Sequence, residues 1–371
     1  LFECFGYDKF RDGQSAVVQA ALAGQDVAVF WATGRGKSIC YQLPALHSGR
    51  TAIVVSPLIS LMTDQVERLN NTVGRGERQV AAFLGSAQLD PTIERRALDG
   101  AFPLVYMSPE KLMMGGTLER LAELHQRKPL LLFAIDEAHC VSEWGHDFRP
   151  EYQQLGLLRK RIPSVPIMAL TATAVPKVQK EILTNLGMRE PHVALQSSFR
   201  SNLTLKCSRK TGNGMSADLA ELLQSLRAAG PRPPSTLIYV AKKQTAEDVA
   251  AYLASRGIPA DFYHGSRTPG DRERVHLNFL SGKLPVVCAT VAFGMGIDKP
   301  DIRNVVHYGA PKTAEEYYQH IGRAGRDGGP STVHMLHNDA DFKSYDSDFY
   351  LGKLPPEQKE RVRQSIGDLR A

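Results

Sequence analysis

A glycine-rich loop between an apolar segment and a helical pattern has the composition of a phosphate-binding site. The segment Val27–Phe30 is followed by WATGRGKS and then by the helical pattern of residues 39–42. In such a loop, backbone N–H groups and the helix N-terminus meet the β-phosphate, lysine neutralises the β/γ oxygens and serine binds Mg²⁺. The residues predicted to bind a nucleotide here are Thr33, Gly34, Arg35, Gly36, Lys37 and Ser38. The loop departs from the strict phosphate-loop pattern at Trp31, where glycine would be required, and a plain turn before a helix is the alternative interpretation.

Two adjacent carboxylates form a second candidate reactive group. The apolar run LLLFAI ends directly in Asp136 and Glu137. Carboxylates at the end of a buried strand are costly unless they hold a cation or take part in a reaction. We therefore expect Asp136 to hold Mg²⁺ through water and Glu137 to polarise the attacking water.

Two arginines three residues apart form a third group, in the segment YYQHIGRAGRDG. On a helix or its last turn, Arg323 and Arg326 would project in the same direction. That arrangement suits the clamping of a γ-phosphate, where arginine stabilises the charge of the transition state. A solvated basic helix end is the other interpretation. Together with the loop and the acidic pair, the arginines indicate an ATPase that works by domain closure.

A loop after Cys140, with the sequence SEWGHDFRPEY, gathers aromatic and basic side chains. Aromatic rings and guanidinium planes stack on unpaired bases, so the loop predicts contact with single-stranded nucleic acid; a small hydrophobic cluster is the alternative. Other loops that follow strands offer hydroxyl and N–H groups to phosphates, although each could be an ordinary turn. The residues predicted to contact nucleic acid are Ser60, Gln65, Ser142, Trp144, His146, Phe148, Arg149, His264, Thr290, Phe293 and Met295.

The elements that must position these residues are short apolar runs alternating with amphipathic stretches. The runs predicted as strands are residues 27–30, 52–55, 104–106, 130–135, 167–170, 236–240, 286–288 and 305–308. This alternation indicates parallel sheets covered by helices on both faces, with ligands bound at the carboxyl ends of the strands. It breaks in a turn-rich stretch near residues 187–235 and then restarts. We place the linker near residues 196–202 and predict two α/β domains, residues 1–198 and 199–345, followed by a helical tail, residues 346–371, that begins a further module.

The composition excludes several classes of protein. Of the 371 residues, 43% are hydrophobic and 23% are charged, which is ordinary globular usage and excludes a disordered or fibrous chain. The net charge of +6 is compatible with a polyanionic partner. The five cysteines lie far apart without a C-x-x-C pair, so we expect no zinc site, no disulfide framework and a reducing, intracellular location. We expect no membrane span and no secretory signal, and we interpret the start at Leu1 as that of a piece of a longer protein.

These motifs, including ATGRGKS, DEAH, SEWGHDFR and QHIGRAGRDG, resemble those of the RecQ family of superfamily 2 DNA helicases across nearly the whole chain. In order, the similar segments are residues 1–14 (adenine-reading motif), 33–38 (motif I), 56–65 (Ia), 136–139 (II), 142–149 (aromatic-rich loop), 171–173 (III), 239–248 (IV), 289–298 (V) and 319–328 (VI). Some of these sequence segments are most similar to those of the Werner-type branch of the family.

The resemblance implies two tandem RecA-like domains, with the ATP site in the cleft between them. It implies an ATP- and Mg²⁺-dependent helicase that moves 3′ to 5′ on single-stranded DNA and unwinds forked or tailed duplexes in repair, recombination and replication. It adds Phe10, Arg11 and Gln14 as nucleotide contacts and Gln319 as a catalytic residue, and it makes Arg326 the arginine finger with Arg323 as its companion. The location would be the nucleus in a eukaryote, or the cytoplasm and nucleoid in a bacterium.

Two other functions stay open on the sequence. The first is an RNA helicase of the DEAD/DEAH kind, against which stand the aromatic-rich loop and the sequence TAT in place of SAT. The second is an inactive nucleic-acid scaffold, which the presence of Lys37, Glu137, Arg323 and Arg326 opposes. The family's four-cysteine zinc module and winged helix are not found after motif VI, so we expect this stretch alone to hold duplex weakly.

Overall fold

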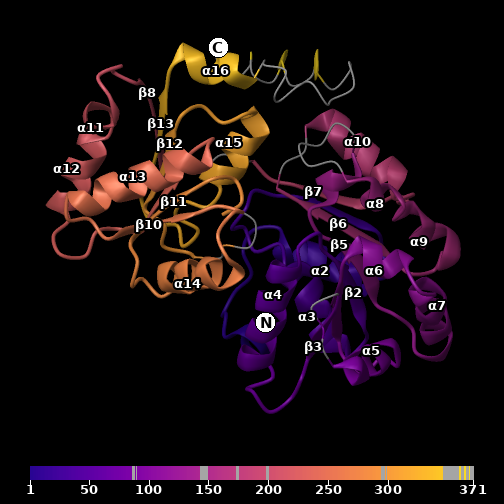
Figure 1. Ribbon diagram of the computed structural model, residues 1–371. Helices are drawn as coiled ribbons and strands as arrows, with labels where there is room; N and C mark the ends of the chain where they lie inside the picture. Colours follow the sequence, from indigo (N-terminus) through magenta and orange to yellow (C-terminus); the bar gives the residue numbers. More distant parts are fainter. Residues whose placement is uncertain are drawn as a thin grey trace. The chain divides into compact units, whose positions relative to one another are not determined.

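Two parallel sheets organise the computed structural model, one in each of two compact units, Leu1–Ser198 and Phe199–Ala371 (Figure 1). The structure describes residues 1–85, 88, 90–142, 149–172, 175–197, 200–293, 297, 299–345, 359–360, 363–364 and 367, without the side chains at positions 60 and 315. Most of the predicted tail, residues 346–371, lies outside this description.

The first unit contains a seven-stranded sheet in the order β3-β4-β2-β5-β6-β1-β7. Its strands are β1 (Val27–Phe30), β2 (Ala52–Val55), β3 (Ala81–Leu84), β4 (Leu104–Met107), β5 (Leu132–Ile135), β6 (Ile167–Thr171) and β7 (His192–Leu195). All neighbouring strands pair in parallel, so their carboxyl ends lie at one edge of the sheet. Strands β1 to β6 are buried throughout, whereas the edge strand β7 is only partly covered.

Helices cover both faces of this sheet because successive strand residues point to opposite sides. Val27 and Val29 belong to the core under α2, α3 and α4, while Ala28 and Phe30 belong to the core under the helices from α5 to α10. The helices are α1 (Phe2–Phe5), α2 (Gln14–Leu22), α3 (Ile39–Ser48), α4 (Ile59–Thr72), α5 (Pro91–Leu98), α6 (Pro109–Met113), α7 (Thr117–Arg127), η1 (Ala138–Val141), α8 (Pro150–Gln153), α9 (Gly156–Arg161) and α10 (Pro176–Asn185).

The second unit repeats the plan with a six-stranded parallel sheet in the order β10-β11-β9-β12-β13-β8. Its strands are β8 (Leu203–Arg209), β9 (Thr236–Tyr239), β10 (Ala260–Tyr263), β11 (Val286–Ala289), β12 (Asn304–Tyr308) and β13 (Ser331–His337). Its helices are α11 (Met215–Asp218), α12 (Ala220–Ala228), α13 (Lys243–Ser255), α14 (Pro269–Leu280), α15 (Ala314–Ile321) and α16 (Asp339–Tyr345). Helices α12 and α13 pack on one face, and α14 and α15 pack on the other.

This architecture confirms the predicted fold class of two parallel-sheet α/β domains. Strands β1, β2 and β9 begin and end at or within one residue of the predicted apolar runs. Five strands were not among the predicted runs: β3, β7, β8, β10 and β13. Within the described residues, no helix combines the length and apolar character needed to cross a bilayer.

Candidate nucleotide and nucleic-acid site

The predicted phosphate loop connects β1 to α3 at the carboxyl edge of the first sheet. Gly34 and Gly36 have φ angles of +84° and +78°, in the left-handed region that favours glycine. A Cβ atom at Gly36 would lie 2.5 Å from Nε2 of Gln14, so a larger residue there would displace the Gln14 amide. Lys37 donates to the Trp31 carbonyl at 2.9 Å, which places its ammonium group over the loop's own turn. Ser38 precedes the first residue of α3.

The predicted adenine-reading residues lie directly on this loop. The Arg11 guanidinium donates to the Gly34 carbonyl at 2.5 Å, and Gln14 Nε2 donates to the Gly36 carbonyl at 3.0 Å. Gln14 Oε1 in turn accepts from the Arg11 backbone N–H at 2.8 Å. Phe10, the third predicted residue of this group, is half-buried. Polar contacts therefore join the loop to a segment that precedes it by 22 to 23 residues.

The acidic pair follows β5, which is separated from β1 in the sheet only by β6. The Asp136 backbone N–H donates to the Val55 carbonyl, and the Glu137 N–H donates to Asp136 Oδ1 at 3.0 Å. Glu137 has a φ of +48°, an unusual conformation for a non-glycine residue that is typical of functional sites. Its carboxylate lies 3.3 Å from His139 Nδ1, which also meets Thr171 Oγ1 at 2.9 Å.

Burial and, to a smaller extent, the Glu137 charge raise the pKa of Asp136 to about 7, although the Lys37 ammonium lowers it. A divalent cation would remove the cost of this desolvated charge, and serine and aspartate supply the oxygen ligands that Mg²⁺ prefers. No group of three or more His, Cys, Asp or Glu side chains gathers as a metal site among the described residues. Magnesium does not need one, because it keeps waters and substrate phosphates as ligands. Ser38 and Asp136 therefore fit a Mg²⁺ site.

The two ends of the aromatic-rich loop are described, whereas Trp144, His146 and Phe148 lie outside the described residues. Ser142 is buried and donates to Glu181 on α10 at 2.6 Å. The Arg149 guanidinium donates to the Pro57 carbonyl at 3.3 Å, and its backbone N–H donates to the Cys140 carbonyl. The two described ends of the loop therefore lie close together, and Arg149 lies beside the predicted motif Ia segment.

The other predicted nucleic-acid contacts differ in whether the structure describes them and in how deeply their side chains are buried. Gln65 accepts a hydrogen bond from the Tyr41 hydroxyl at 3.0 Å, so its carbonyl oxygen is held on the α3 side. The side chain of Ser60 and all of Met295 lie outside the described residues. His264 is buried against Glu247, at 2.9 Å, and Phe293 is buried among aromatic rings, so both face the interior. Thr290 is half-buried at the end of β11.

The predicted arginines lie in the turn that follows α15. Arg323 is 4% exposed, and its backbone N–H donates to the His320 carbonyl. Arg326 and Gln319 are half-buried. The structure thus brings Gln319, Arg323 and Arg326 to one end of α15 in the second unit.

Tyr239, at the end of β9, contacts this turn; it begins the predicted motif IV segment, but sequence reasoning gave it no role of its own. Its ring stacks on His320 with centroids 3.6 Å apart, and its hydroxyl donates to the Phe293 carbonyl at 3.1 Å. Burial raises the pKa of Tyr239, while the charge and hydrogen bond of Arg323 lower it. One hydroxyl therefore joins the arginine turn to the predicted motif V segment.

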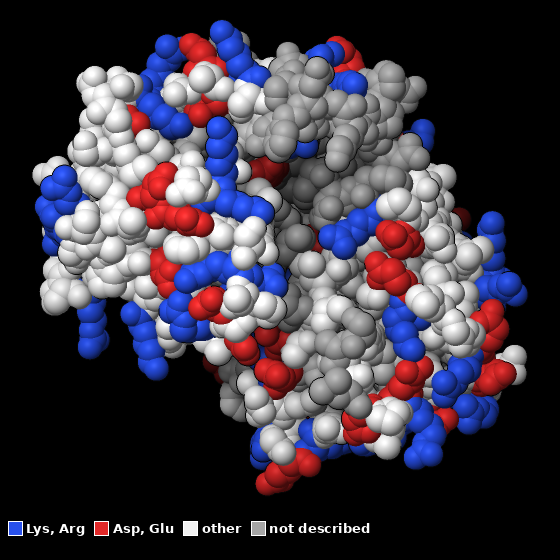
Figure 2. Space-filling model, in the orientation of Figure 1, with Lys and Arg blue, Asp and Glu red and all other residues white. Residues whose placement is uncertain are grey.

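Charged side chains do not form a single-sign field on the face of the molecule drawn in Figure 2. There, blue Lys and Arg side chains alternate with red Asp and Glu side chains over the described residues of both units. Phosphate binding on this face would depend on individual loops more than on bulk charge.

Comparison with known proteins agrees with this geometry. Residues 11–182 match the DEAD/DEAH box helicase family, and residues 217–328 match the helicase conserved C-terminal domain family. The chain resembles S. cerevisiae Dbp5 bound to RNA and ADP BeF3, with a TM-score of 0.68 and 17% identity over 97% of this chain and 95% of that one. At this identity the likeness concerns the fold alone. Fold and matched families define a helicase core of two tandem RecA-like domains.

Two curated relatives identify the family within this class. The probable ATP-dependent DNA helicase RecS of Bacillus subtilis is 39% identical over 92% of this chain and 67% of its own length. The bifunctional 3′-5′ exonuclease/ATP-dependent helicase WRN of Mus musculus is 40% identical over 94% of this chain and 25% of its own. The chain belongs to the RecQ family of DNA helicases. It spans about two thirds or less of the length of these relatives, and their nearly equal identities leave the Werner-type branch a prediction.

Proposed function

We propose that this chain is the motor core of an ATP-dependent DNA helicase that moves along single-stranded DNA. The observation that carries the proposal is the joining of three groups at one edge of the first sheet. Arg11 and Gln14 bond the phosphate loop, and Asp136 follows a strand two places away in the same sheet. An adenine reader, a phosphate cradle and a cation ligand are the parts that ATP hydrolysis requires.

In the proposed reaction, the loop N–H groups and Lys37 hold the β- and γ-phosphates. Lys37 would exchange its bond to the Trp31 carbonyl for phosphate oxygens, which are better acceptors for an ammonium group. Mg²⁺ held by Ser38 and Asp136 would neutralise charge on the phosphates. Glu137, whose carboxylate lies beside His139, would orient the attacking water and accept its proton.

The arginine turn of the second unit would serve the same nucleotide. Arg326 is proposed as the arginine finger and Arg323 as its companion, because guanidinium groups stabilise the charge on the transferring phosphoryl group. Release of this contact after hydrolysis would let the grip of each unit on the DNA backbone alternate. The 3′-to-5′ direction is supported by the family resemblance.

DNA is proposed as the partner because RecS of Bacillus subtilis, of which this chain covers 67%, is named a DNA helicase. The solved structure bound to RNA shares only the fold, so an RNA helicase is not favoured. Single-stranded DNA and forked or tailed duplexes are the proposed substrates, and repair and recombination are the proposed processes. The proposed location is the nucleus in a eukaryote or the cytoplasm and nucleoid in a bacterium.

ATP turnover with single-stranded DNA, with RNA of equal length and without nucleic acid tests this function. We expect DNA to stimulate turnover at least about tenfold more than RNA does. Lys37→Ala should lower turnover by about 10²-fold or more, because it removes the cation that meets the transferring phosphate. DNA binding should be unchanged in this variant. Substantial turnover by Lys37→Ala, or equal stimulation by RNA, would contradict the proposal.

A further inference from the structure

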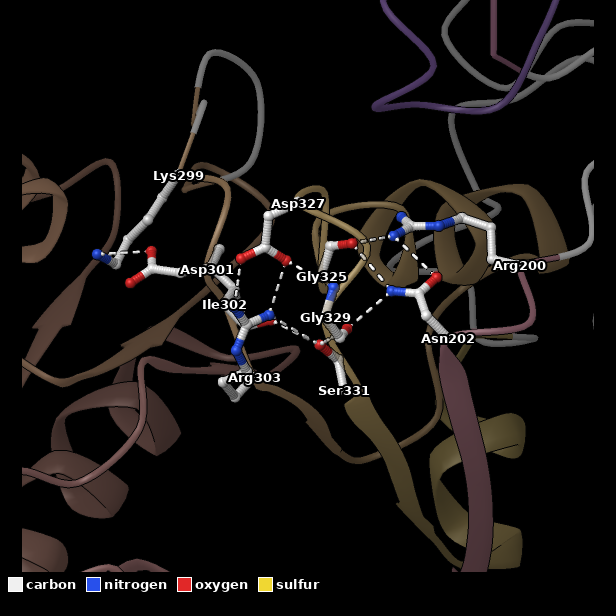
Figure 3. A network of polar contacts seen from close by, with 10 residues as sticks. All are labelled: Arg200, Asn202, Lys299, Asp301, Ile302, Arg303, Gly325, Asp327, Gly329 and Ser331. Carbon is white, nitrogen blue, oxygen red and sulfur yellow. Dashed lines mark hydrogen bonds and ion pairs between the residues drawn. The ribbon is translucent and has the colours of Figure 1, made fainter. Parts of the chain in front are cut away.

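Polar side chains from other parts of the second unit form hydrogen bonds and an ion pair with the turn that carries Arg323 and Arg326, on two of its sides. Figure 3 shows Arg200 and Asn202 reaching the turn from one side, while Arg303 pairs with Asp327 on the other. Arg303 also lies 3.4 Å from Ser331 Oγ, which in turn donates to the Gly329 carbonyl at 3.1 Å. These contacts form one connected network around residues 322–329.

Gly325, which lies between the two arginines in sequence, is the centre of this network. Its carbonyl accepts from Arg200 Nη2 at 2.5 Å, from Asn202 Nδ2 at 3.0 Å and from the Gly328 N–H at 3.0 Å. Its own N–H donates to the Ile302 carbonyl at 2.8 Å. The peptide units on both sides of Gly325 are therefore fixed by hydrogen bonds to other segments.

The position also admits no side chain. Gly325 has a φ of +50°, and a Cβ atom there would lie 2.5 Å from Ser331 Oγ, 2.6 Å from Asn202 Nδ2 and 2.7 Å from the Gly329 carbonyl oxygen. The side chains around Gly325 therefore pack directly against its backbone, and only glycine leaves room for them. This close packing allows the turn one conformation.

Arg200 and Asn202 come from the start of the second unit, within the segment predicted as the linker. Asn202 also donates to the Gly329 carbonyl at 2.9 Å, and Arg200 lies 3.4 Å from the Gly322 carbonyl. The backbone is anchored as well, because the Ser331 N–H donates to the Asn202 carbonyl at 2.9 Å. Three glycine carbonyls of the arginine turn are thus held by two side chains that lie just after the unit boundary.

We propose that Arg200 and Asn202 are positioning residues that set the direction of Arg323 and Arg326 and tie the interdomain linker to the arginine turn. This inference rests on the proposed function, in which those arginines act on ATP. Neither residue would touch the nucleotide; each acts by fixing the peptide between the two arginines. A change in the conformation of the linker would then move the arginine turn directly through these hydrogen bonds.

The first test compares Arg200→Ala with Arg209→Ala, a matched control. Arg209 ends the strand that follows Arg200, but its guanidinium contacts the exposed Asp339 and its side chain is 70% exposed. Arg200→Ala should lower kcat for DNA-stimulated ATP turnover about tenfold with KM for ATP changed less than about threefold, because misplacing a catalytic group affects mainly the transition state. Arg209→Ala should match the wild type in both constants.

A double-mutant cycle separates positioning from a general structural role. If Arg200 acts through the arginine turn, Arg200→Ala should change kcat less than about twofold in an Arg326→Ala background, because effects on one functional unit do not add. Asn202→Ala is the second variant, with the same expectation, should Arg200→Ala not fold. The inference would be overturned if the effect of Arg200→Ala on kcat multiplied with that of Arg326→Ala, and the effect of Asn202→Ala did the same.

The wild type distinguishes a failure of this inference from a failure of the proposed function. A wild type that hydrolyses ATP with DNA, together with an Arg200→Ala variant equal to Arg209→Ala, would overturn the positioning role alone. A wild type without DNA-stimulated turnover would overturn the proposed function and, with it, this inference.

Discussion

The side chain of Gln14 reaches the phosphate loop because position 36 has no side chain of its own. At this scale, the residues that sequence reasoning identified are those whose type and spacing are both restrictive, such as Gly36, Lys37 and Asp136. Tyr239 and Arg200 were not identified as functional. A single tyrosine at the end of a strand, or a single arginine near a linker, has no spacing signal, and the Phe293 and Gly325 carbonyls that these side chains contact are more than 50 residues away.

Tyr239 provides the prediction that belongs to the residue scale. Tyr239→Phe removes only the hydroxyl that donates to the Phe293 carbonyl and accepts from Arg323. We expect DNA-stimulated kcat to fall about fivefold, while unfolding free energy falls by only about 1 kcal/mol, the usual contribution of one hydrogen bond. Steady-state kinetics with chemical denaturation measures both quantities.

Tyr308→Phe is the matched control for that variant. The Tyr308 hydroxyl donates to Asp218 Oδ2 at 3.1 Å, and its ring packs against the opposite core of the same sheet. This variant should lose similar stability with unchanged turnover. Equal losses of turnover in both variants would show that the Tyr239 hydroxyl matters only for folding.

At the scale of elements, predictability followed burial only in part, because β3 is buried throughout and was still not among the predicted runs. Strands β1 and β2 are covered on both faces, so they consist of continuous apolar residues and were predicted. Strands β7 and β8 are partly exposed edge strands with mixed sequences, and both fall in the stretch interpreted as a break. Their hydrogen bonds to β1 and β13 decide their structure, and such pairing across the chain has no local sequence signal.

Helix α15 provides the prediction at this scale through Glu316. Burial raises the pKa of Glu316 from 4.5 to about 7, although the Lys312 charge lowers it. The unfolded chain therefore ionises this group first, so its contribution to stability is present below pH 4.5 and is lost as the pH rises to about 7. Glu316→Gln should raise the melting temperature relative to the wild type by a few degrees at pH 8, and by about zero at pH 4.5.

Thermal unfolding of both proteins at several pH values measures this difference. Because the other titrating groups are shared, including Asp136 with its raised pKa, their contributions cancel in the comparison. A melting-temperature difference that stays constant between pH 4.5 and 8 would show that Glu316 is not desolvated in the folded state.

At the scale of the whole molecule, each unit supplies part of one proposed motor. The first contributes the nucleotide loop, Asp136 and Glu137, and the second contributes the arginine turn with the residues that hold it. Two domains of one fold class could be predicted because the β-α alternation restarts in the second half of the sequence. The contacts that hold the arginine turn could not be predicted. Arg200, Arg303 and Asp327 come together only when the six strands of the second sheet have paired.

Directional movement on single-stranded DNA is the property that defines the proposed motor, and it can be measured without duplex unwinding. Streptavidin bound to biotin at one end of an oligonucleotide is displaced when a motor arrives at that end. With ATP and Mg²⁺, we predict rapid displacement from the 5′ end, slow displacement from the 3′ end, and neither with Lys37→Ala. Displacement that is independent of ATP, or that is faster from the 3′ end, would show that the chain is not a 3′-to-5′ motor.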